Sequence, residues 1–247
     1  MRQKVNIPLY IGSKNRPNFP MARLVNGATL LVEPQDLSLY KMLHGESFKI
    51  GILPENDKGF TYMVQNLLEQ AEKDKAKYFM FCDDDIYGFK NRDKTPFIFD
   101  QMFAEGVQLM ARNGYSQLMI SFAGHNWYEE GLVKEKAGAW GCFIGKTEDM
   151  LRVGGYDLSL PLFSDWDMSA KLIQAGFKTA CWYQPMFSHK MKGMKGGAEF
   201  LYKDGENTKK AIAILKERYG DAVREVEAHG QKEARFDWKK LSTSRTA

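Results

Sequence analysis

The stretch Lys77–Gly88, KYFMFCDDDIYG, decides the fold expected for this chain. Its apolar run, residues 78–82, has the length and composition of a buried β-strand, and it ends abruptly in Asp83, Asp84 and Asp85. Three adjacent carboxylates repel one another, and a divalent cation held by carboxylate oxygens is the usual compensation. Ligands of open α/β sheets bind beyond the carboxyl ends of the strands. The stretch therefore predicts a site for a metal ion and a nucleotide diphosphate; a solvated acidic turn is the alternative interpretation.

The composition is that of a globular protein from a reducing compartment. A chain of 247 residues with 44% hydrophobic residues can form one α/β domain or at most two small ones. No apolar run approaches the length of a membrane span, and the run after Met1–Lys4 is too short for a signal peptide. The cysteines are far apart in apolar runs, which favours buried free thiols and a cytoplasmic location: Cys82, Cys142 and Cys181. The net charge of +4 permits a polyanionic partner without requiring one.

Strand-like and helix-like segments alternate before the acidic stretch. Helices are expected at 35–43 and 60–73, where the apolar residues of the second have helical spacing. Strands are expected at 5–11, 28–32, 48–53 and 78–82. This alternation predicts a mostly parallel sheet covered by helices. Ser13, Arg16 and Glu33 follow the first two strands and are candidate nucleotide contacts, with an ordinary surface turn as the alternative for residues 12–17.

In the second half of the chain, strands are expected at 118–122, 138–144 and 178–183, and helices at 97–112, 164–175 and 207–219. Polar and charged residues follow several of these elements as well. His125 and Trp127 lie in a loop that faces an acceptor or forms a structural aromatic corner. Asp165 and Asp167 lie in the first turn of a helix, where its dipole alone also favours acids. Beyond Gly220 we expect a surface helix and then a frayed basic tail.

The late loop is Gly-rich and basic. His189 is able to bind a metal ion, and Lys190 and Lys192 are placed to close over a diphosphate.

The order of these features resembles that of GT-A glycosyltransferases, from Val5 to about Gly197. Two segments carry the resemblance, CFIGKTEDMLRVGGYDLSL at 142–160 and SDWDMSAKLIQAGFK at 164–178. The first is similar to the strand–helix–GGFD element of that family, and the second to its ED-x-D-L helix. The resemblance implies a single compact α/β domain at 1–220, with a nucleotide-binding half (1–95) and an acceptor half (96–200), followed by a basic polar C-terminal extension at 221–247.

The resemblance also implies roles for matching residues. The metal, Mn²⁺ or Mg²⁺, would be bound by Asp83, Asp85 and His189, with Asp83 also at the ribose. The UDP-sugar donor would be contacted by Ser13, Arg16, Glu33, Asp84, Lys190 and Lys192. Asp165 would be the general base of an inverting transfer to a hydroxyl group, and this agrees with the chemistry because a hydroxyl is a poor nucleophile that needs a carboxylate within reach. Ser164 stands where Glu is usual, which leaves the choice between Asp165 and Asp167 open.

A narrower resemblance concerns the acceptor. The segments IGSKNRP at 11–17, LLVEPQDLSLY at 30–40 and CDDDIYGF at 82–89 look like the small phage-type glycosyltransferases associated with TET/JBP base oxidases. These transfer sugars to hydroxymethylated bases in DNA. The resemblance implies 5-hydroxymethylcytosine in double-stranded phage DNA as acceptor and the host cytoplasm as location. Three side-chain rings would stack on a base extruded from the duplex: His125, Trp127 and Trp166.

Other classes are weighed on the same residues. A cell-surface glycan or a small metabolite is the alternative acceptor. A haloacid-dehalogenase-type phosphatase would have its acidic motif near the N-terminus, with Thr or Val at the position of Tyr87. A non-catalytic sugar-nucleotide or DNA-binding module would not need Asp83, Asp85, Asp165 and His189 together.

Overall fold

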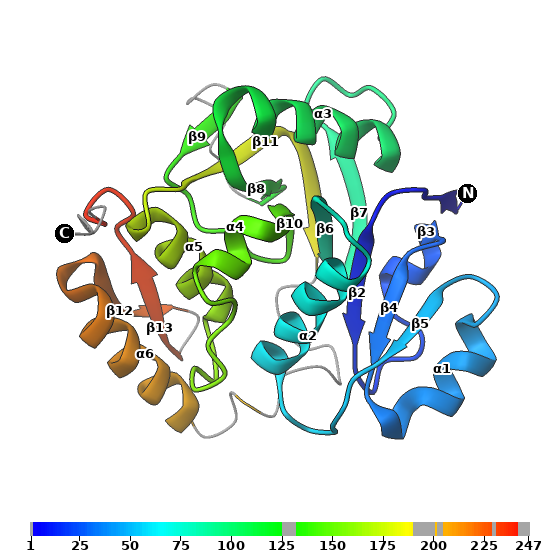
Figure 1. Cartoon of the computed structure of the whole chain (residues 1–247), viewed down its shortest axis with the longest axis horizontal. Helices are drawn as coiled ribbons and strands as arrows, with labels where there is room; N and C mark the ends of the chain where they lie inside the picture. The colour runs from blue at the N-terminus through cyan, green and yellow to red at the C-terminus, as the bar shows by residue number, and fades with distance from the viewer. Residues whose placement is uncertain (1, 125–131, 190–200, 202–204, 229–230, 242–247) are drawn as a thin grey trace.

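A nine-stranded sheet forms the centre of the protein in this computed structural model, which describes residues 2–124, 132–189, 201, 205–228 and 231–241. The strand order is β5-β4-β2-β6-β10-β8-β11-β7, and β9 pairs with β11 (Figure 1). The bounds are β2 Leu9–Ser13, β4 Thr29–Val32, β5 Lys49–Ile52, β6 Tyr78–Asp83, β7 Ile86–Asn91, β8 Tyr115–Phe122, β9 Val133–Glu135, β10 Cys142–Lys146 and β11 Lys178–His189.

The sheet is mostly parallel, as the sequence predicts. Strands β5, β4, β2 and β6 are parallel neighbours, and β8 and β11 run in the same direction. Only β10, β7 and β9 of these described strands run the other way. A further small parallel pair, β1 (Gln3–Lys4) with β3 (Val25–Asn26), lies outside this sheet.

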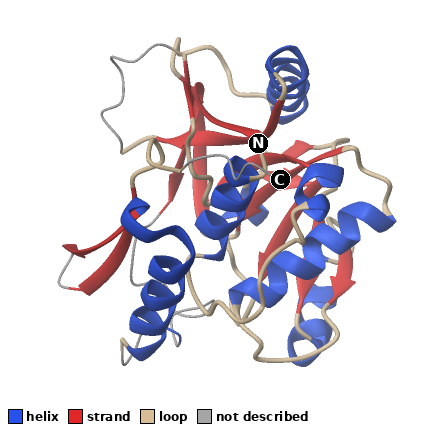
Figure 2. Cartoon of the chain, turned by 60° about the vertical axis from the view of Figure 1, so that its left-hand side comes forward, coloured by secondary structure: helices blue, strands red, loops and turns tan. Residues whose placement is uncertain are grey.

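Helices flank the sheet, and Figure 2 shows them in blue around the red strands. They are α1 Leu37–His44, α2 Phe60–Lys73, α3 Phe99–Asn113, α4 Thr147–Arg152, α5 Ser164–Gln174 and α6 Glu206–Tyr219, with short 3-10 turns η1 Pro20–Arg23, η2 Pro34–Asp36 and η4 Gly220–Ala222. The helices expected at 60–73 and 207–219 are therefore confirmed within a residue. None of the described helices is long and apolar enough to cross a membrane.

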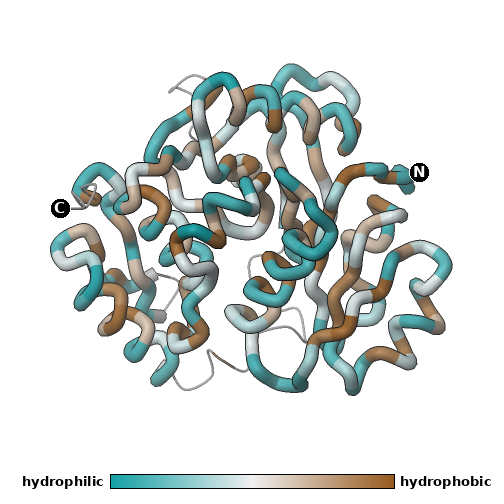
Figure 3. Tube along the Cα trace, in the orientation of Figure 1, coloured by the Kyte–Doolittle hydropathy of each residue, from teal (hydrophilic) through white to brown (hydrophobic). Residues whose placement is uncertain are grey.

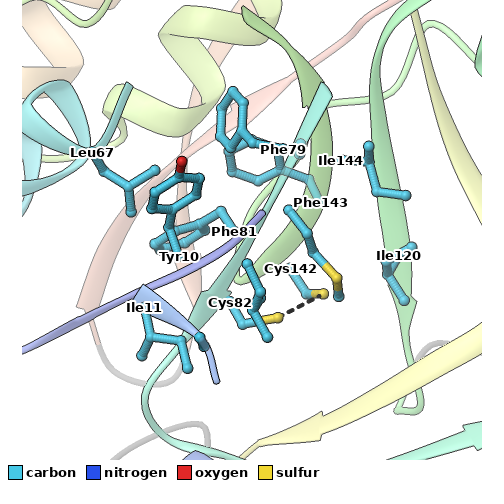
Figure 4. Close-up of a cluster of buried hydrophobic side chains, with 14 of the residues drawn as sticks. Tyr10, Ile11, Leu67, Phe79, Phe81, Cys82, Ile120, Cys142, Phe143 and Ile144 are labelled. Atoms are coloured by element: carbon cyan, nitrogen blue, oxygen red, sulfur yellow. Dashed lines mark hydrogen bonds between the residues drawn. The ribbon is translucent and has the colours of Figure 1, made fainter. Parts of the chain in front are cut away.

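Buried aromatic and aliphatic side chains fill the core beside β6 and β10 (Figure 4). Phe79 and Phe143 pack edge to face with ring centroids 6.0 Å apart. Cys82 and Cys142 lie opposite each other on β6 and β10, with their sulfur atoms 3.4 Å apart. All three cysteines are buried free thiols, which confirms the prediction from the sequence. The core therefore reaches the residue that directly precedes the acidic stretch.

A second apolar cluster, which we call the C-terminal cluster, joins α5, α6 and a β-hairpin of β12 (Val223–Ala228) and β13 (Gln231–Phe236). The surface helix expected after Gly220 is thus wrong. Val223 pairs with Phe236 across the hairpin, and both are buried; apolar residues at alternate positions favour a strand. Figure 3 shows hydrophobic and hydrophilic residues alternating along α6, as expected of a helix with one buried face.

Strand β7 is the second difference from the sequence expectation. No strand was expected at residues 86–91, but they form an edge strand on β11. Pairing with a long neighbouring strand overrides weak local β-propensity. The acidic stretch therefore forms a tight connection between β6 and β7.

Candidate active site

The carboxyl ends of β2, β4 and β6 meet at one edge of the sheet. Gly12 pairs with Asp83, and Ser13 pairs with Val32, the residue before Glu33. Parallel neighbours end at the same edge, so residues from three separate segments come together there. Ser13, Glu33 and Asp83 therefore lie at the same edge of the sheet.

The three adjacent carboxylates have different surroundings. Asp84 is 6% exposed and turns into the protein. Its Oδ2 accepts a hydrogen bond from Ser13 Oγ at 2.5 Å, and its Oδ1 forms an ion pair with the Arg16 guanidinium. Burial raises the pKa of Asp84 to about 6, against the opposing effect of Arg16 and Ser13. Asp84 is therefore engaged with the protein itself.

Asp83 ends β6 beside Gly141. Its backbone N–H donates to Gly141 O at 2.7 Å. Gly141 has φ +64°, and a Cβ there would lie 3.6 Å from Asp83 Oδ2 and 3.0 Å from the Phe187 ring. Burial, followed by the charges of Asp85, Asp84 and Asp165, raises the pKa of Asp83 well above its usual range. A glycine thus leaves space beside a carboxylate whose charge is poorly compensated.

Asp85, in the turn between β6 and β7, faces His189 at the end of β11. His189 Nδ1 lies 3.9 Å from Asp85 Oδ1, and Oδ1 is buried without a hydrogen bond among the described residues. Two ligands of one divalent ion are about 3–4 Å apart when each is about 2.1 Å from the ion. The pair therefore fits two positions of a metal shell. Burial raises the pKa of Asp85, opposed by His189 and Arg16.

The aromatic surroundings of His189 fix its ring. The ring centroids of Phe122, Trp140 and Phe187 lie 5.1, 5.2 and 5.8 Å from that of His189. The strand is irregular between Ser188 and His189, where the pairing with β7 shifts register. Bulges of this kind re-aim a side chain, and here the residue after the bulge is the one beside Asp85.

The predicted set of three protein ligands is not assembled. Within the described residues, which include Asp83, Asp85 and His189, no three His, Cys, Asp or Glu side chains are grouped as metal ligands. Asp83 is therefore not grouped with Asp85 and His189, and its part in binding a metal stays a prediction. A metal that binds nucleotide phosphates keeps only one or two protein carboxylates, so the pair remains sufficient for such an ion.

Glu33 follows β4 and is 4% exposed. Its Oε1 lies 3.0 Å from Lys14 Nζ and accepts the Asp57 N–H at 3.0 Å, and its Oε2 accepts Gln35 Nε2 at 2.6 Å. Both carboxylate oxygens thus have protein partners. Its contact with a nucleoside stays a prediction, and a ligand there would share or replace these bonds.

Asp165 lies half-buried in the first turn of α5. Burial raises the pKa of its carboxyl to about 7, although the Trp166 backbone N–H, 2.8 Å from Oδ1, opposes this. Its charge in turn raises the pKa values of Asp83 and the buried Tyr156. The helix is entered through Phe163 at φ +61°, a strained conformation for a bulky residue that occurs mostly at functional sites. Asp165 is therefore close enough to Asp83 for the two charges to interact.

Asp167, the other candidate base, is fully buried. Tyr219 Oη and Arg218 Nη1 donate to Asp167 Oδ1 at 2.7 and 3.0 Å, and Lys171 Nζ lies 3.2 Å from Oδ2. Arg218 also forms an ion pair with Asp157. This packing gives Asp167 a structural role, in which it ties α5 to α6. The role of Asp165 as the base stays a prediction.

We expect Asp167→Ala to lower the free energy of unfolding by about 3–5 kcal/mol, because removing one partner of a buried ion pair leaves the other uncompensated. The measurement is urea denaturation. Glu217→Ala is the matched control: it is exposed and adjacent to Arg218, so its change is expected within about 0.5 kcal/mol. Equal stability of Asp167→Ala and Glu217→Ala would contradict the structural role.

The predicted acceptor residues have different outcomes. Trp166 stacks on Phe163 with ring centroids 5.7 Å apart and packs against Phe236 and Trp238. Trp166 is therefore part of the C-terminal cluster, which disfavours its expected role as a platform for a base. The other predicted acceptor and diphosphate contacts lie outside the described residues: His125, Trp127, Lys190 and Lys192.

Two residues that contact predicted site residues were missed by sequence reasoning. Tyr40 Oη lies 2.8 Å from Ser13 Oγ and accepts the Arg16 backbone N–H at 3.0 Å. Arg218 reaches Asp167 across 51 residues of sequence. The position of Tyr40 in an expected helix gave a weak signal. A partner as distant as Arg218 gave none.

No protein-family model matches this sequence, and no curated protein matches it. The solved structures that are similar in fold include two at 11% sequence identity. TarS 1–349 of S. aureus in complex with UDP has a TM-score of 0.50, over 87% of this chain and 66% of that one. GalNAc-T7 with UDP, GalNAc and Mn²⁺ has a TM-score of 0.54, over 90% of this chain and 49% of that one.

The likeness establishes the fold. A mostly parallel, helix-flanked sheet in one compact domain is the architecture of GT-A glycosyltransferases, as the sequence predicts. The chain spans about half to two thirds of the length of these two proteins.

Proposed function

We propose that this chain is a metal-dependent glycosyltransferase that moves a sugar from a UDP-sugar to a hydroxyl group. The observation that carries the proposal is the convergence of Asp165 with the acidic stretch at the carboxyl end of β6 in a GT-A fold. Two proteins of this fold, TarS and GalNAc-T7, have been crystallised with UDP, and the second also with Mn²⁺. Fold alone does not set function, so the residues of the site carry the argument.

Asp165 supplies the general base of an inverting reaction. Its carboxylate takes the proton of the acceptor hydroxyl, whose oxygen bonds to the anomeric carbon while the bond from that carbon to the diphosphate breaks. UDP leaves with the electron pair of the broken bond, and the proton stays on Asp165. A base with a pKa near the working pH is well matched to this task, and burial gives Asp165 a pKa of about 7.

Asp85 and His189 would hold the divalent cation, since their facing atoms lie 3.9 Å apart and Asp85 Oδ1 is an unsatisfied buried oxygen among the described residues. When bound, such an ion supplies positive charge to the leaving diphosphate. By resemblance to GT-A glycosyltransferases, Lys190 and Lys192, which come shortly after His189 in the sequence, would contact the same diphosphate. By the same resemblance, Asp83 would contact the ribose.

The proposed acceptor is 5-hydroxymethylcytosine in double-stranded DNA, by resemblance of residues 11–17, 30–40 and 82–89 to phage-type DNA base glycosyltransferases. The basic net charge of +4 is compatible with phosphate contacts. A cell-surface glycan or small metabolite is the second candidate, and the same catalytic residues serve either acceptor.

A transfer assay tests both levels of the proposal. The enzyme, Mn²⁺ and a panel of UDP-sugars are incubated with duplex DNA containing 5-hydroxymethylcytosine, and unmodified DNA is treated in parallel. The DNA is then digested, and the masses of the nucleosides are measured by mass spectrometry. A sugar-sized gain on the modified DNA alone supports the DNA acceptor and gives the sugar mass. Metal-dependent UDP release only with another acceptor would move the acceptor to glycans or metabolites. No UDP release with any donor would contradict the transferase.

The activity is expected to depend on pH through Asp165. Only its carboxylate form accepts a proton, and its pKa is about 7, so kcat at saturating substrates should fall as pH drops through about 7 and level off above it. The measurement is UDP release from about pH 5 to 9. The Kd of UDP over the same range is the control for a loss of nucleotide binding. A constant kcat over this range would exclude Asp165 as the titrating base.

A further inference from the structure

The middle carboxylate of the acidic stretch has no open face. Asp84 is 6% exposed, and each of its carboxylate oxygens has a protein partner, Ser13 Oγ at 2.5 Å on Oδ2 and the Arg16 guanidinium on Oδ1. Ser13 Oγ is also 2.8 Å from Tyr40 Oη, which accepts the Arg16 backbone N–H at 3.0 Å. These four residues close a buried ring of polar contacts around the loop after β2.

The same ring reaches the metal side of the turn. Arg16 Nη1 lies 4.0 Å from Asp85 Oδ2, while its main partner is Asp84. The backbone of Asp84 is held as well, since its carbonyl accepts the Met21 N–H at 3.2 Å. The positively charged guanidinium of Arg16 therefore lies between the carboxylates of Asp84 and Asp85. The Arg16 side chain is only 13% exposed.

We propose that Asp84 and Arg16 are positioning residues that hold the carboxylate of Asp85 in place for the metal, rather than contacts of the nucleotide. Asp84 anchors the guanidinium, and the guanidinium sets the charge and position beside Asp85 Oδ2, which leaves Oδ1 directed toward His189. Partners of metal ligands of this kind fix ligand orientation and typically change metal affinity by about 10–100-fold when they are replaced. This inference rests on the proposed function, because it assigns a role around the metal of that site.

The test is a double-mutant cycle on metal binding. Asp84→Asn keeps the shape of the side chain and removes its charge, and Arg16→Gln removes the guanidinium. With saturating UDP, the Kd of Mn²⁺ is measured by electron paramagnetic resonance of the free ion. Each single variant should raise this Kd by about 10–100-fold, and the double variant should be no weaker than the weaker single variant, because both changes break one interaction.

Controls separate this role from loss of fold. Asp221→Asn makes the same chemical change at an exposed position and should bind Mn²⁺ like the wild type. The thermal midpoint of each variant is recorded; should Asp84→Asn fail to fold, Arg16→Gln alone still tests whether the guanidinium supports the metal. Rescue by Arg16→Lys, which restores a cation of poorer geometry, is expected to be partial.

The outcomes distinguish failure of the positioning role from failure of the proposed function. Wild-type affinity for Mn²⁺ in folded Asp84→Asn and Arg16→Gln would overturn the positioning role and leave the proposed function intact. Losses that multiply in the double variant would also overturn it, because the two residues would then act separately. A wild type that binds UDP but no Mn²⁺ would overturn the metal-dependent function and this inference with it.

Discussion

Asp165→Asn is expected to lower kcat by about 10²–10⁴-fold, the usual contribution of a positioned general base. The amide keeps the size of the side chain but cannot take the proton of the acceptor hydroxyl. Donor binding should be preserved, because the diphosphate site is built by other residues. The measurement is kcat for UDP-sugar consumption with acceptor present, together with the Kd of UDP.

The companion variant is Asp167→Asn, two residues along the same helix. If Asp165 is the base, Asp167→Asn should lower stability more than kcat, since Asp167 is fully buried against Arg218 and Tyr219. Retention of normal kcat by Asp165→Asn would contradict its role. An additional fall in UDP affinity would indicate that Asp165 shapes the donor site through its charge on Asp83.

Asp85→Ala is expected to lower metal-dependent kcat/KM by about 10³-fold, the equivalent of about 4 kcal/mol of transition-state stabilisation. The variant loses the carboxylate that faces His189 at 3.9 Å. It should fold normally and melt at or above the wild-type temperature, because burial already disfavours the charged form of Asp85, as its raised pKa indicates.

Activity as a function of Mn²⁺ concentration measures this effect, with thermal melting beside it. Asp93→Ala, an exposed acid beyond the far end of β7, is the control. Unchanged activity of Asp85→Ala would exclude it as a metal ligand. A lower melting temperature would instead assign Asp85 a structural role like that of Asp167.

The sequence was sufficient for the fold and for the edge of the sheet that carries the site. An apolar run ending in three acids, after alternating strands and helices, predicted a carboxyl-end site in an α/β sheet. It did not predict that Asp84 would turn inward, because the direction of a side chain in a tight turn depends on partners such as Arg16 and Ser13. The sequence shows that three carboxylates are present, but tertiary contacts determine which of them turns into the protein.

The remaining errors have the same origin. The C-terminal hairpin was mistaken for a helix because most of its residues are polar. Only a few buried positions, such as Val223, Ala234 and Phe236, carry the alternating pattern of a strand. The packing of Trp166 against Phe236 could not be predicted either, because the two residues are about 70 positions apart in sequence. Local patterns do not report contacts at such separations.

The link between Asp167 and Arg218 has a consequence for synthesis on the ribosome. The central sheet is complete once β11 has been made, but the helix that presents Asp165 is secured by a residue 51 positions after Asp167 and by the hairpin beyond it. Proteins fold from the N-terminus as they are synthesised. A nascent chain that stops before Arg218 would therefore have the central sheet in place while α5 is still loosely held. If residues 1–95 bind the nucleotide and Asp165 is the base, as proposed, UDP binding should mature earlier than transfer.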